Sequence, residues 1–484
     1  MPSPDPHSPI IVWFRRDLRL ADHPALAFAA ATGRPVLPAY ILDEATDGPQ
    51  GAAARWWLER SLASLRRDLA ALGAPLVCRR GPPAGVLAEL AKVAGAGLVV
   101  FNAALTPKAR TRDAEVTTQL AAAGIACQTL AGDLLFEPGQ LRNRTGGAFK
   151  VFTPFWRACL AASSPARPLP APARIRAAAP VRGEDPAAWG LSPRAPDWAA
   201  GFAEWWTPGE AAARDRLAEF VGGTLAGYAR VRDRVDQEGT SRLSPHLAFG
   251  EIGPRQIWHA VETARAAAPG LEAGAERFLA EIGWREFAHH LLAEAPDMGS
   301  LPLQPAFAHF PYAEDTAGLR AWQRGRTGYP IVDAAMRQLW QTGWMHNRLR
   351  MIAASFLVKD LLLPWTAGEA WFRDTLLDAD PANNAAGWQW VAGCGADAAP
   401  YFRVFNPVLQ AGKFDPDGAF TRRFVPELAA LPAPAIHSPW RHPDLLARHG
   451  IRLGRDYPAP IVDHDTARRR ALAAFADIRT GAFA

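Results

Sequence analysis

The sequence predicts two domains: an N-terminal α/β domain with a doubly wound, Rossmann-like sheet of five parallel strands, and a larger all-α domain after it. Over residues 10–130, five short apolar runs alternate with amphipathic helical stretches, whereas from residue 207 onward the pattern is helical and β-branched runs are few. Continuous apolar strands separated by helices are typical of a parallel sheet covered on both faces. The length of 484 residues also exceeds what one hydrophobic core usually serves.

Each predicted strand is a short run of apolar residues. The five runs are residues 10–14, 36–42, 76–78, 98–101 and 125–130. A doubly wound sheet binds ligands at the carboxyl ends of its strands. The charged run 15–19 follows the first strand directly, so it is expected at such an edge.

Composition sets the predicted domain boundaries. Residues 1–131 form the α/β domain, and residues 132–206 are rich in Pro and Ala. Because Pro lacks the donor that regular structure needs, this stretch is predicted to be a long irregular surface connector. Residues 207–484 form the helical domain. One of its helices is expected to begin at Ser244 and Pro245, with Ser as the N-cap and Pro at the first helical position.

Bulk composition excludes several classes of protein. Hydrophobic and charged residues make up 49% and 21% of the chain, as in soluble globular proteins, and no apolar run could span a bilayer. The N-terminus does not resemble a signal peptide. Four widely separated cysteines give no zinc, iron–sulfur or disulfide pattern, so we expect a reduced, cytoplasmic protein without a metal. The 53 basic against 48 acidic residues permit a nucleic-acid partner.

The segment 239–244 could bind phosphate. It offers three hydroxyl groups, from Thr240, Ser241 and Ser244, just before a predicted helix. A helix N-terminus has unpaired N–H groups and the positive end of the dipole, which suit an anion. The alternative is a plain capping loop.

Two predicted helices each place polar and aromatic groups on one face. Glu281, Trp284 and Arg285 have the spacing i, i+3, i+4, and Asn347, Arg350 and Met351 repeat it. Facing each other, such helices could line a polar and aromatic pocket. The alternative is a salt-bridged helix pair around a buried Trp.

A third cluster, residues 378–390, holds two carboxylates, two amides and two indoles within thirteen positions. Buried carboxylates need charged or N–H partners, and Arg350 could supply one for Asp378. The alternative is a polar turn that caps a helix.

Together these segments resemble the photolyase/cryptochrome family over nearly the whole chain, and most closely its bacterial class I-type cyclobutane pyrimidine dimer photolyases. The matching segments are residues 13–19, 240–244, 281–287, 328–337, 344–351 and 378–390. The resemblance implies a lyase that repairs UV-damaged DNA. Blue light drives an electron from reduced FAD into a flipped pyrimidine dimer. It also implies a U-shaped FAD in the helical domain and an antenna chromophore, methenyltetrahydrofolate or deazaflavin, at the α/β domain.

The resemblance also implies roles for individual residues. Cofactor contacts are expected from Tyr228, Thr240, Ser241, Arg242, Leu243, Ser244, Phe278, Arg350, Asp378, Ala379, Asp380 and Asn384. The lesion pocket is expected to use Glu281, Trp284, Asn347, Met351, Trp390 and Asn384. DNA contacts are expected from Glu281, Trp284, Arg285, Asn347, Arg348, Arg403 and Gln410.

The family reduces its flavin through a relay of tryptophans, and this chain departs from it at one position. Trp388 and Trp365 match the first two members, whereas the third position is Tyr312. Either Tyr312 is the terminal donor, or Trp322 or Trp390 replaces it. Phe278 also stands where a Trp is common near the flavin, and we expect this exchange to be tolerated.

Three other functions are alternatives to dimer repair. A cryptochrome would share the fold and FAD, but plant-type members usually carry Asp where this chain has Asn384, and no signalling tail is expected here. Repair of the (6-4) photoproduct is associated with a histidine pair, whereas this pocket would hold Asn347 and Met351. An electron-transfer flavoprotein would not need Glu281 beside two indoles. The protein is expected to act as a monomer and away from membranes.

Overall fold

The computed structural model describes residues 7–45, 51–397 and 402–480. The chain divides into two compact units. The first comprises Met1–Ala226, Ser241–Pro296 and Leu377–Asp380, and the second comprises Gly227–Thr240, Asp297–Leu376 and Pro381–Ala484. Several helices that follow residue 207 thus belong to the same unit as the sheet, while the predicted domain boundaries at 131 and 206 stay a prediction.

The sheet of the first unit has five parallel strands, as predicted. They are β1 (Ile10–Phe14), β2 (Val36–Leu42), β3 (Val77–Arg80), β4 (Leu98–Asn102) and β5 (Ala126–Leu130). The spatial order is β3-β2-β1-β4-β5, with Ile10 of β1 paired to Val36 on one side and Leu98 on the other. The order reverses between β1 and β4, which is the doubly wound topology that the apolar runs indicated.

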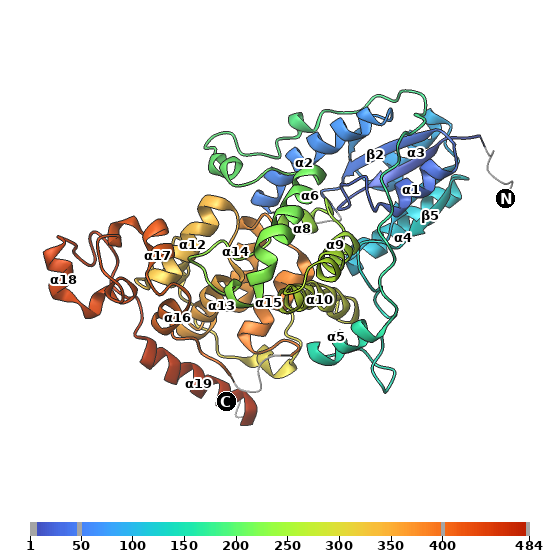
Figure 1. Cartoon of the computed structure of the whole chain (residues 1–484). Helices are drawn as coiled ribbons and strands as arrows, with labels where there is room; N and C mark the ends of the chain where they lie inside the picture. The colour runs from blue at the N-terminus through green and yellow to red at the C-terminus, as the bar shows by residue number, and fades with distance from the viewer. Residues whose placement is uncertain (1–6, 46–50, 398–401, 481–484) are drawn as a thin grey trace. The chain divides into compact units, whose positions relative to one another are not determined.

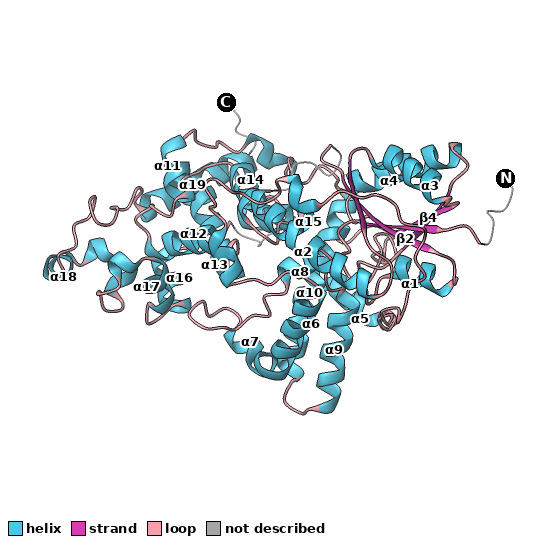
Figure 2. Cartoon of the chain, turned by 90° about the horizontal axis from the view of Figure 1, so that it is seen from above, coloured by secondary structure: helices cyan, strands magenta, loops and turns pink. Residues whose placement is uncertain are grey.

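Helices cover both faces of this sheet. Figure 2 shows α3 (Pro83–Ala94) and α4 (Pro107–Ala122) on one side of the strands and α1 (Pro24–Ala31) on the other. Ile11 and Trp13 of β1 join the hydrophobic cluster formed with α3 and α4. Their neighbours in β1 are equally buried, because alternate side chains of a strand point to opposite faces. This two-sided burial explains why the strand sequences are apolar throughout.

A polar network occupies the carboxyl ends of β1 and β4. Asp17 accepts a hydrogen bond from Asn102 Nδ2 at 2.8 Å and lies 3.0 Å from His23 Nε2. Arg15 pairs with Asp113 and donates to the carbonyl of Asn102. Burial alone would raise the pKa of Asp17, but His23 and Arg15 hold it well below its ordinary value. The charged run that follows β1 therefore ties together the segments at this edge.

The predicted connector, residues 132–206, is irregular for most of its length but contains one helix that the composition did not reveal. Helix α5 (Phe152–Ala161) buries Phe152, Phe155 and Cys159 and packs against α10 (Glu272–Glu294). These three apolar residues lie at helical spacing, which stabilises the helix although Pro154 lies within it. Two short 3₁₀ turns, Pro186–Trp189 and Ala200–Glu204, complete the stretch.

The remaining helices of the first unit are α2 (Ala52–Ala71), α6 (Glu210–Glu219), α8 (Ser244–Ala248) and α9 (Pro254–Ala267). Helix α10 packs on α9 as well as on α5. Close packing at the start of α10 requires a glycine, because a Cβ on Gly274 would lie 1.8 Å from the carbonyl oxygen of Leu225. Helix α10 is thus held along its length by three neighbouring segments.

The second unit is helical, as predicted. Its helices are α7 (Tyr228–Val231), α11 (Thr316–Gln323), α12 (Pro330–Thr342), α13 (Asn347–Ser355), α14 (Trp365–Thr375), α15 (Pro381–Ala392), α16 (Pro407–Phe414), α17 (Ala419–Phe424), α18 (Pro443–Arg448) and α19 (His464–Thr480). Helix α12 packs against α13, α16 and α17, and α15 packs against α13 and α14 (Figure 1). A π-helical turn, η6 (Phe356–Asp360), continues α13. Within the described ranges, no helix is long and apolar enough to cross a bilayer.

Candidate functional site

Helix α10 presents four of the predicted site residues, and three of them are Phe278, Glu281 and Trp284. Phe278 is buried and its ring lies 4.4 Å from that of Phe220. Glu281 Oε1 lies 3.3 Å from Arg277 Nη2, and a quarter of the Glu281 side chain is exposed. Trp284 stacks face to face on Phe152 of α5, with ring centroids 3.8 Å apart and planes 9° apart. One face of the indole is therefore supported by protein.

Arg285, predicted to contact DNA, has its guanidinium engaged within the first unit. It donates to the carbonyl of Asp133 at 3.2 Å and to Glu286 at 3.1 Å, and only 12% of its side chain is exposed. A DNA contact by Arg285 stays a prediction.

Sequence reasoning gave Glu286 no role, yet it anchors α10. The side chain is fully buried, and its carboxylate accepts hydrogen bonds from the backbone N–H groups of Leu135 and Phe136 at 2.7 and 3.3 Å. Burial raises the pKa of Glu286 to about 7, although Arg285 and the two N–H groups oppose the shift. The sequence did contain one indication of this role, because Glu286 is an ionisable residue on the apolar face of a long predicted helix.

The segment predicted to bind phosphate forms a tight turn before α8. Arg242 has a left-handed backbone conformation, with φ of 52°, and Ser241 Oγ accepts a hydrogen bond from the Leu243 N–H at 3.4 Å. Leu243 is buried, whereas Thr240, Ser241, Arg242 and Ser244 are half-buried.

The expected N-cap at Ser244 is wrong by one residue. The carbonyl of Leu243 already accepts the hydrogen bond from Leu247, so Leu243 is the cap and Ser244 is the first helical residue. No side chain caps α8, so the Ser244 hydroxyl does not act as a helix cap.

Residues 378–380 bring a carboxylate close to a histidine in the first unit. Asp378 and Ala379 are buried, and Asp380 Oδ2 lies 3.6 Å from His289 Nε2. His289 is fully buried, and neither ring nitrogen has a hydrogen-bond partner among the described residues. Burial lowers the pKa of His289 to about 4, although Asp380 opposes the shift. A neutral imidazole thus stands beside Asp380 with hydrogen-bonding capacity for a ligand.

Helix α13 carries four predicted site residues, Asn347, Arg348, Arg350 and Met351. Asn347 is exposed, and Arg348 pairs with Asp233 at 2.8 Å while approaching the sulfur of Met351 at 3.7 Å. Arg350 donates from Nε to the Met345 carbonyl at 2.8 Å. Its predicted pairing with Asp378 stays a prediction.

Tyr228, the remaining predicted phosphate contact, is buried at the start of α7. The guanidinium carbon of Arg232 lies 5.7 Å from the centroid of its ring. One cation therefore lies beside the tyrosine ring.

Asn384 of α15 is fixed by α14. Its side-chain amide donates to Glu369 twice, to Oε1 at 2.9 Å and to the backbone carbonyl at 3.1 Å. Burial raises the pKa of Glu369, while Arg373 and Asn384 lower it. The orientation of the Asn384 carboxamide is thereby set.

Trp388, the first predicted relay member, is almost fully buried. Its ring contacts Phe372 edge-on at 5.0 Å and Trp322 at 6.1 Å, and a Cβ on Gly368 would lie 2.1 Å from it. Its indole N–H has no hydrogen-bond partner in the described part of the chain. Trp388 therefore has one buried donor available for a bound group.

The other relay residues lie on different elements. Trp365 is buried at the start of α14, and Tyr312 packs against Phe310 at 4.9 Å. The ring of Trp322, which the sequence left as an alternative donor, contacts that of Trp388.

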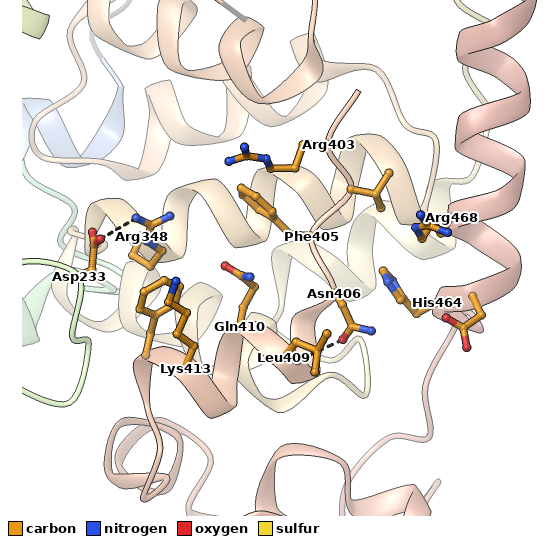
Figure 3. A pocket seen from close by; sticks show the side chains of 13 residues that line it. Asp233, Arg348, Arg403, Phe405, Asn406, Leu409, Gln410, Lys413, His464 and Arg468 are labelled. Carbon is orange, nitrogen blue, oxygen red and sulfur yellow. Dashed lines mark hydrogen bonds and ion pairs between the residues drawn. The ribbon is translucent and has the colours of Figure 1, made fainter. Parts of the chain in front are cut away.

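A basic groove of about 680 Å³ gathers three of the predicted DNA-contacting residues, Arg348, Arg403 and Gln410 (Figure 3). Lys413 of α16 and Arg468 of α19 add two cations that sequence reasoning missed. Both side chains are exposed, and in the sequence they cannot be distinguished from ordinary surface charges. Asp233 pairs with Arg348, and Asp465 is the other carboxylate that lines the groove, so cations outnumber anions there.

Trp390, a predicted wall of the lesion pocket, is half-buried and lines a separate small cavity together with Phe402 and Arg403. The predicted pocket as a whole takes side chains from both units, and its assembly stays a prediction. Across the described ranges no group of His, Cys, Asp and Glu could hold a metal ion.

Two family models match the chain. The model described as DNA photolyase matches residues 10–173, and the model described as the FAD binding domain of DNA photolyase matches residues 278–477. Together they span the sheet and most of the predicted site residues.

Similar proteins include both photolyases and cryptochromes. The deoxyribodipyrimidine photo-lyase of Agrobacterium fabrum is 48% identical, with 98% of each chain covered. Cryptochrome-1 of Arabidopsis thaliana is 40% identical over 95% of this chain and 69% of its own. The crystal structure of a bacterial class III photolyase from Agrobacterium tumefaciens superposes with a TM-score of 0.95 at 47% identity and covers 99% of each chain. This class III neighbour does not support the expected class I subtype.

The anchoring role of Glu286 predicts a pH-dependent stability. The pKa of Glu286 is about 7 in the folded protein and about 4.5 in the unfolded chain. Between these two pH values the folded carboxyl keeps its proton, whereas the unfolded carboxyl loses it. Stability from Glu286 is therefore present below about pH 4.5 and is lost as the pH rises through 7, by about 3 kcal/mol.

Urea unfolding between pH 4.5 and 8 measures this effect. Glu286→Gln should flatten the pH dependence, whereas Glu294→Gln, on the same helix but paired with Arg142 at the surface, should preserve it. Equal slopes for the parent and Glu286→Gln would contradict the assigned pKa.

Proposed function

The chain belongs to the photolyase/cryptochrome family, and from this premise we propose that it is a light-dependent DNA lyase that repairs cyclobutane pyrimidine dimers with FAD as cofactor. The observation that favours a repair enzyme over a signalling cryptochrome is the side-chain amide at position 384. Glu369 Oε1 lies 2.9 Å from Asn384 Nδ2, so an aspartate at 384 would face a second carboxylate and need a proton. Asn384 gives a neutral, oriented carboxamide at every pH.

The residues present fit a bound FAD. A large polar cofactor needs hydrogen-bond partners in a buried site, and His289 and the Trp388 N–H supply buried groups with that capacity. Tyr228 and the turn 240–244 would hold its phosphates. Asp378 and Asp380 would contact its flavin portion, with Arg350 paired to Asp378. When bound, FAD absorbs blue light and supplies the electron that opens the dimer. The protein's own residues orient the cofactor and the lesion.

Trp284 and Trp390 would form the walls that hold the flipped dimer. Phe152 supports one face of Trp284, which leaves the opposite face for a pyrimidine. Stacking of a base on an aromatic ring contributes about 1–3 kcal/mol. A dimer stacks poorly in the duplex, so it leaves the helix at a lower cost than an intact base pair. Glu281 would hydrogen-bond the pyrimidine edge, and Asn347 and Met351 would complete the pocket.

The groove shown in Figure 3 would bind the DNA backbone around the flipped lesion. Arg403, Lys413 and Arg468 would each neutralise a phosphate, whereas Arg348 is already paired with Asp233. Such binding weakens steeply as salt rises, because each neutralised phosphate releases counterions. We also propose that the protein acts as a monomer in the cytoplasm, on nucleoid DNA.

A light-dependent repair assay tests this function. An oligonucleotide with one thymine dimer should be restored only under blue light, while a matched (6-4) oligonucleotide should remain damaged. Denaturation should release FAD, and the spectrum of any second chromophore should distinguish methenyltetrahydrofolate from deazaflavin. Repair of the (6-4) lesion, or no repair of either, would overturn the proposal.

Glu281→Ala should lower the repair yield while FAD remains bound. The carboxyl would be lost from the pyrimidine edge, but the cofactor contacts assigned above would remain. An absorbance spectrum reports the flavin, and repair per absorbed photon reports the effect, expected at about tenfold or more if one charge-assisted hydrogen bond is lost. Loss of the flavin itself would contradict the role of Glu281.

The relay alternatives predict different photoreduction rates. Trp322→Phe should slow flavin photoreduction more than Tyr312→Phe, because the Trp322 ring contacts Trp388 directly. Neither variant should affect repair by chemically pre-reduced enzyme. Absorbance under blue light follows the reduction, and an unchanged rate in Trp322→Phe would exclude it as a donor.

A further inference from the structure

A lysine is buried at the end of the π-helical turn η6, where none of the roles described above requires a charge. Lys359 has no exposed surface. Its Nζ donates to the backbone carbonyl of Arg403 at 3.3 Å and lies 3.2 Å from the centroid of the Phe402 ring. Burying an amine is costly unless it is paired, so these two contacts must offset a substantial desolvation cost.

A second contact four residues earlier holds the same stretch of chain. Ser355 Oγ accepts a hydrogen bond from the backbone N–H of Phe405 at 3.2 Å. Ser355 and Lys359 thus hold the backbone of residues 403 and 405 from two successive turns. Single π-turns inserted into helices are frequent at functional sites, because they redirect side chains by a fraction of a turn.

The stretch 402–405 supplies a wall of the groove. Arg403 and Phe405 line the basic groove, and both also line a cavity of about 20 Å³ together with Trp390 and Lys359. That volume has room for about one water molecule. A shift of residues 402–405 would therefore move a groove cation and the surroundings of the lesion-facing Trp390 together.

We propose that Lys359, together with Ser355, is a positioning residue that fixes residues 402–405 so that Arg403 and Trp390 recognise the flipped lesion. The proposal rests on the proposed repair function and concerns the same site. Lys359 acts through the backbone of Arg403 and does not itself touch the DNA.

The charge of Lys359 gives this role a measurable signature. Burial lowers the pKa of Lys359 to about 7, although Cys394 and Asp360 oppose the shift. Asp360 is itself engaged by His464 at 2.5 Å and by Arg470, which donates to its backbone carbonyl. The Arg403 guanidinium is the other charge on the contacting stretch. A protonated amine binds a carbonyl and an aromatic face more strongly than a neutral one. Lesion binding should therefore weaken as the pH rises through about 7.

Lys359→Met in the FAD-loaded full chain tests the proposal, because methionine fills a similar volume without a donor or charge. Binding of a thymine-dimer oligonucleotide and of its undamaged counterpart is measured from pH 6 to 9. We expect about a tenfold loss of lesion affinity, the size of one charge-assisted hydrogen bond, and loss of the pH step near 7. Affinity for undamaged DNA should fall less than affinity for the lesion, because only the lesion-bearing oligonucleotide would also use Trp390.

Lys413→Met provides the matched contrast, because this lysine lines the groove itself and is exposed. It should weaken binding of both oligonucleotides equally, reduce the salt dependence and keep the pH step. Ser355→Ala should reproduce part of the lesion-specific loss and also keep the pH step.

Two results would overturn the proposal: unchanged lesion discrimination with an intact pH step in Lys359→Met, or equal behaviour of Lys359→Met and Lys413→Met. If Lys359→Met loses FAD, the Ser355→Ala variant tests the proposal in its place. Unchanged discrimination between the dimer and undamaged DNA in Ser355→Ala would then overturn the proposal. A parent protein that neither repairs nor prefers the dimer would instead overturn the proposed function.

Discussion

The free-energy cost of burying a charged group away from water determines how helix α10 packs in the first unit. Glu286 lies at full burial in the middle of α10, and it remains there because Leu135 N–H, Phe136 N–H and Arg285 bind its carboxylate. An unpaired carboxylate at that depth would cost several kcal/mol. The pairing fixes the rotation of α10 against the chain that follows the sheet. Once that rotation is set, Glu281 and Trp284 keep partial exposure, while Phe278 and Phe287 face the interior.

The same constraint organises the second unit. The carboxylate of Asp333 accepts hydrogen bonds from the N–H groups of Thr327 and Gly328 and from the hydroxyls of Thr327 and Tyr457, which ties the start of α12 to a segment more than a hundred residues away. Asp415 similarly accepts from Phe420 and Thr421 at the start of α17. Because buried acids take their partners from within the fold, cations such as Lys413 and Arg468 remain on the surface, where they can neutralise an external anion. The groove is basic although the net charge of the chain is only +5.

These pairings also explain how far the sequence could predict the molecule. The five strands and their parallel arrangement followed from apolar runs, because a strand covered on both faces has a local signature. Helix α5 was missed because a high proline content masked three apolar residues at helical spacing. The contacts of Glu286, His289 and Lys359 could not be predicted because the groups that they approach, near residues 135, 380 and 403, are distant in sequence. The N-cap of α8 was misplaced because Ser244 has the composition of a cap, whereas the first helical hydrogen bond begins at the Leu243 carbonyl. Local patterns identify elements, but long-range pairing of polar groups decides which residues are available to a ligand.

The departure at Tyr312 has a physical consequence for electron supply. A phenol that gives up an electron also releases its proton, whereas an indole can be oxidised first and lose its proton later. Burial raises the pKa of Tyr312, and Cys394 nearby adds to the shift, so its surroundings oppose formation of the deprotonated oxygen. Trp322 has no such requirement. Its N–H is satisfied by the Ala353 carbonyl at 2.9 Å, and its ring meets those of Trp388 and Phe372. We therefore propose that the aromatic cluster of α11, α14 and α15 serves as an electron path whose tryptophans need no proton acceptor at the moment of transfer. Such a path would make a tyrosine at the usual third position tolerable.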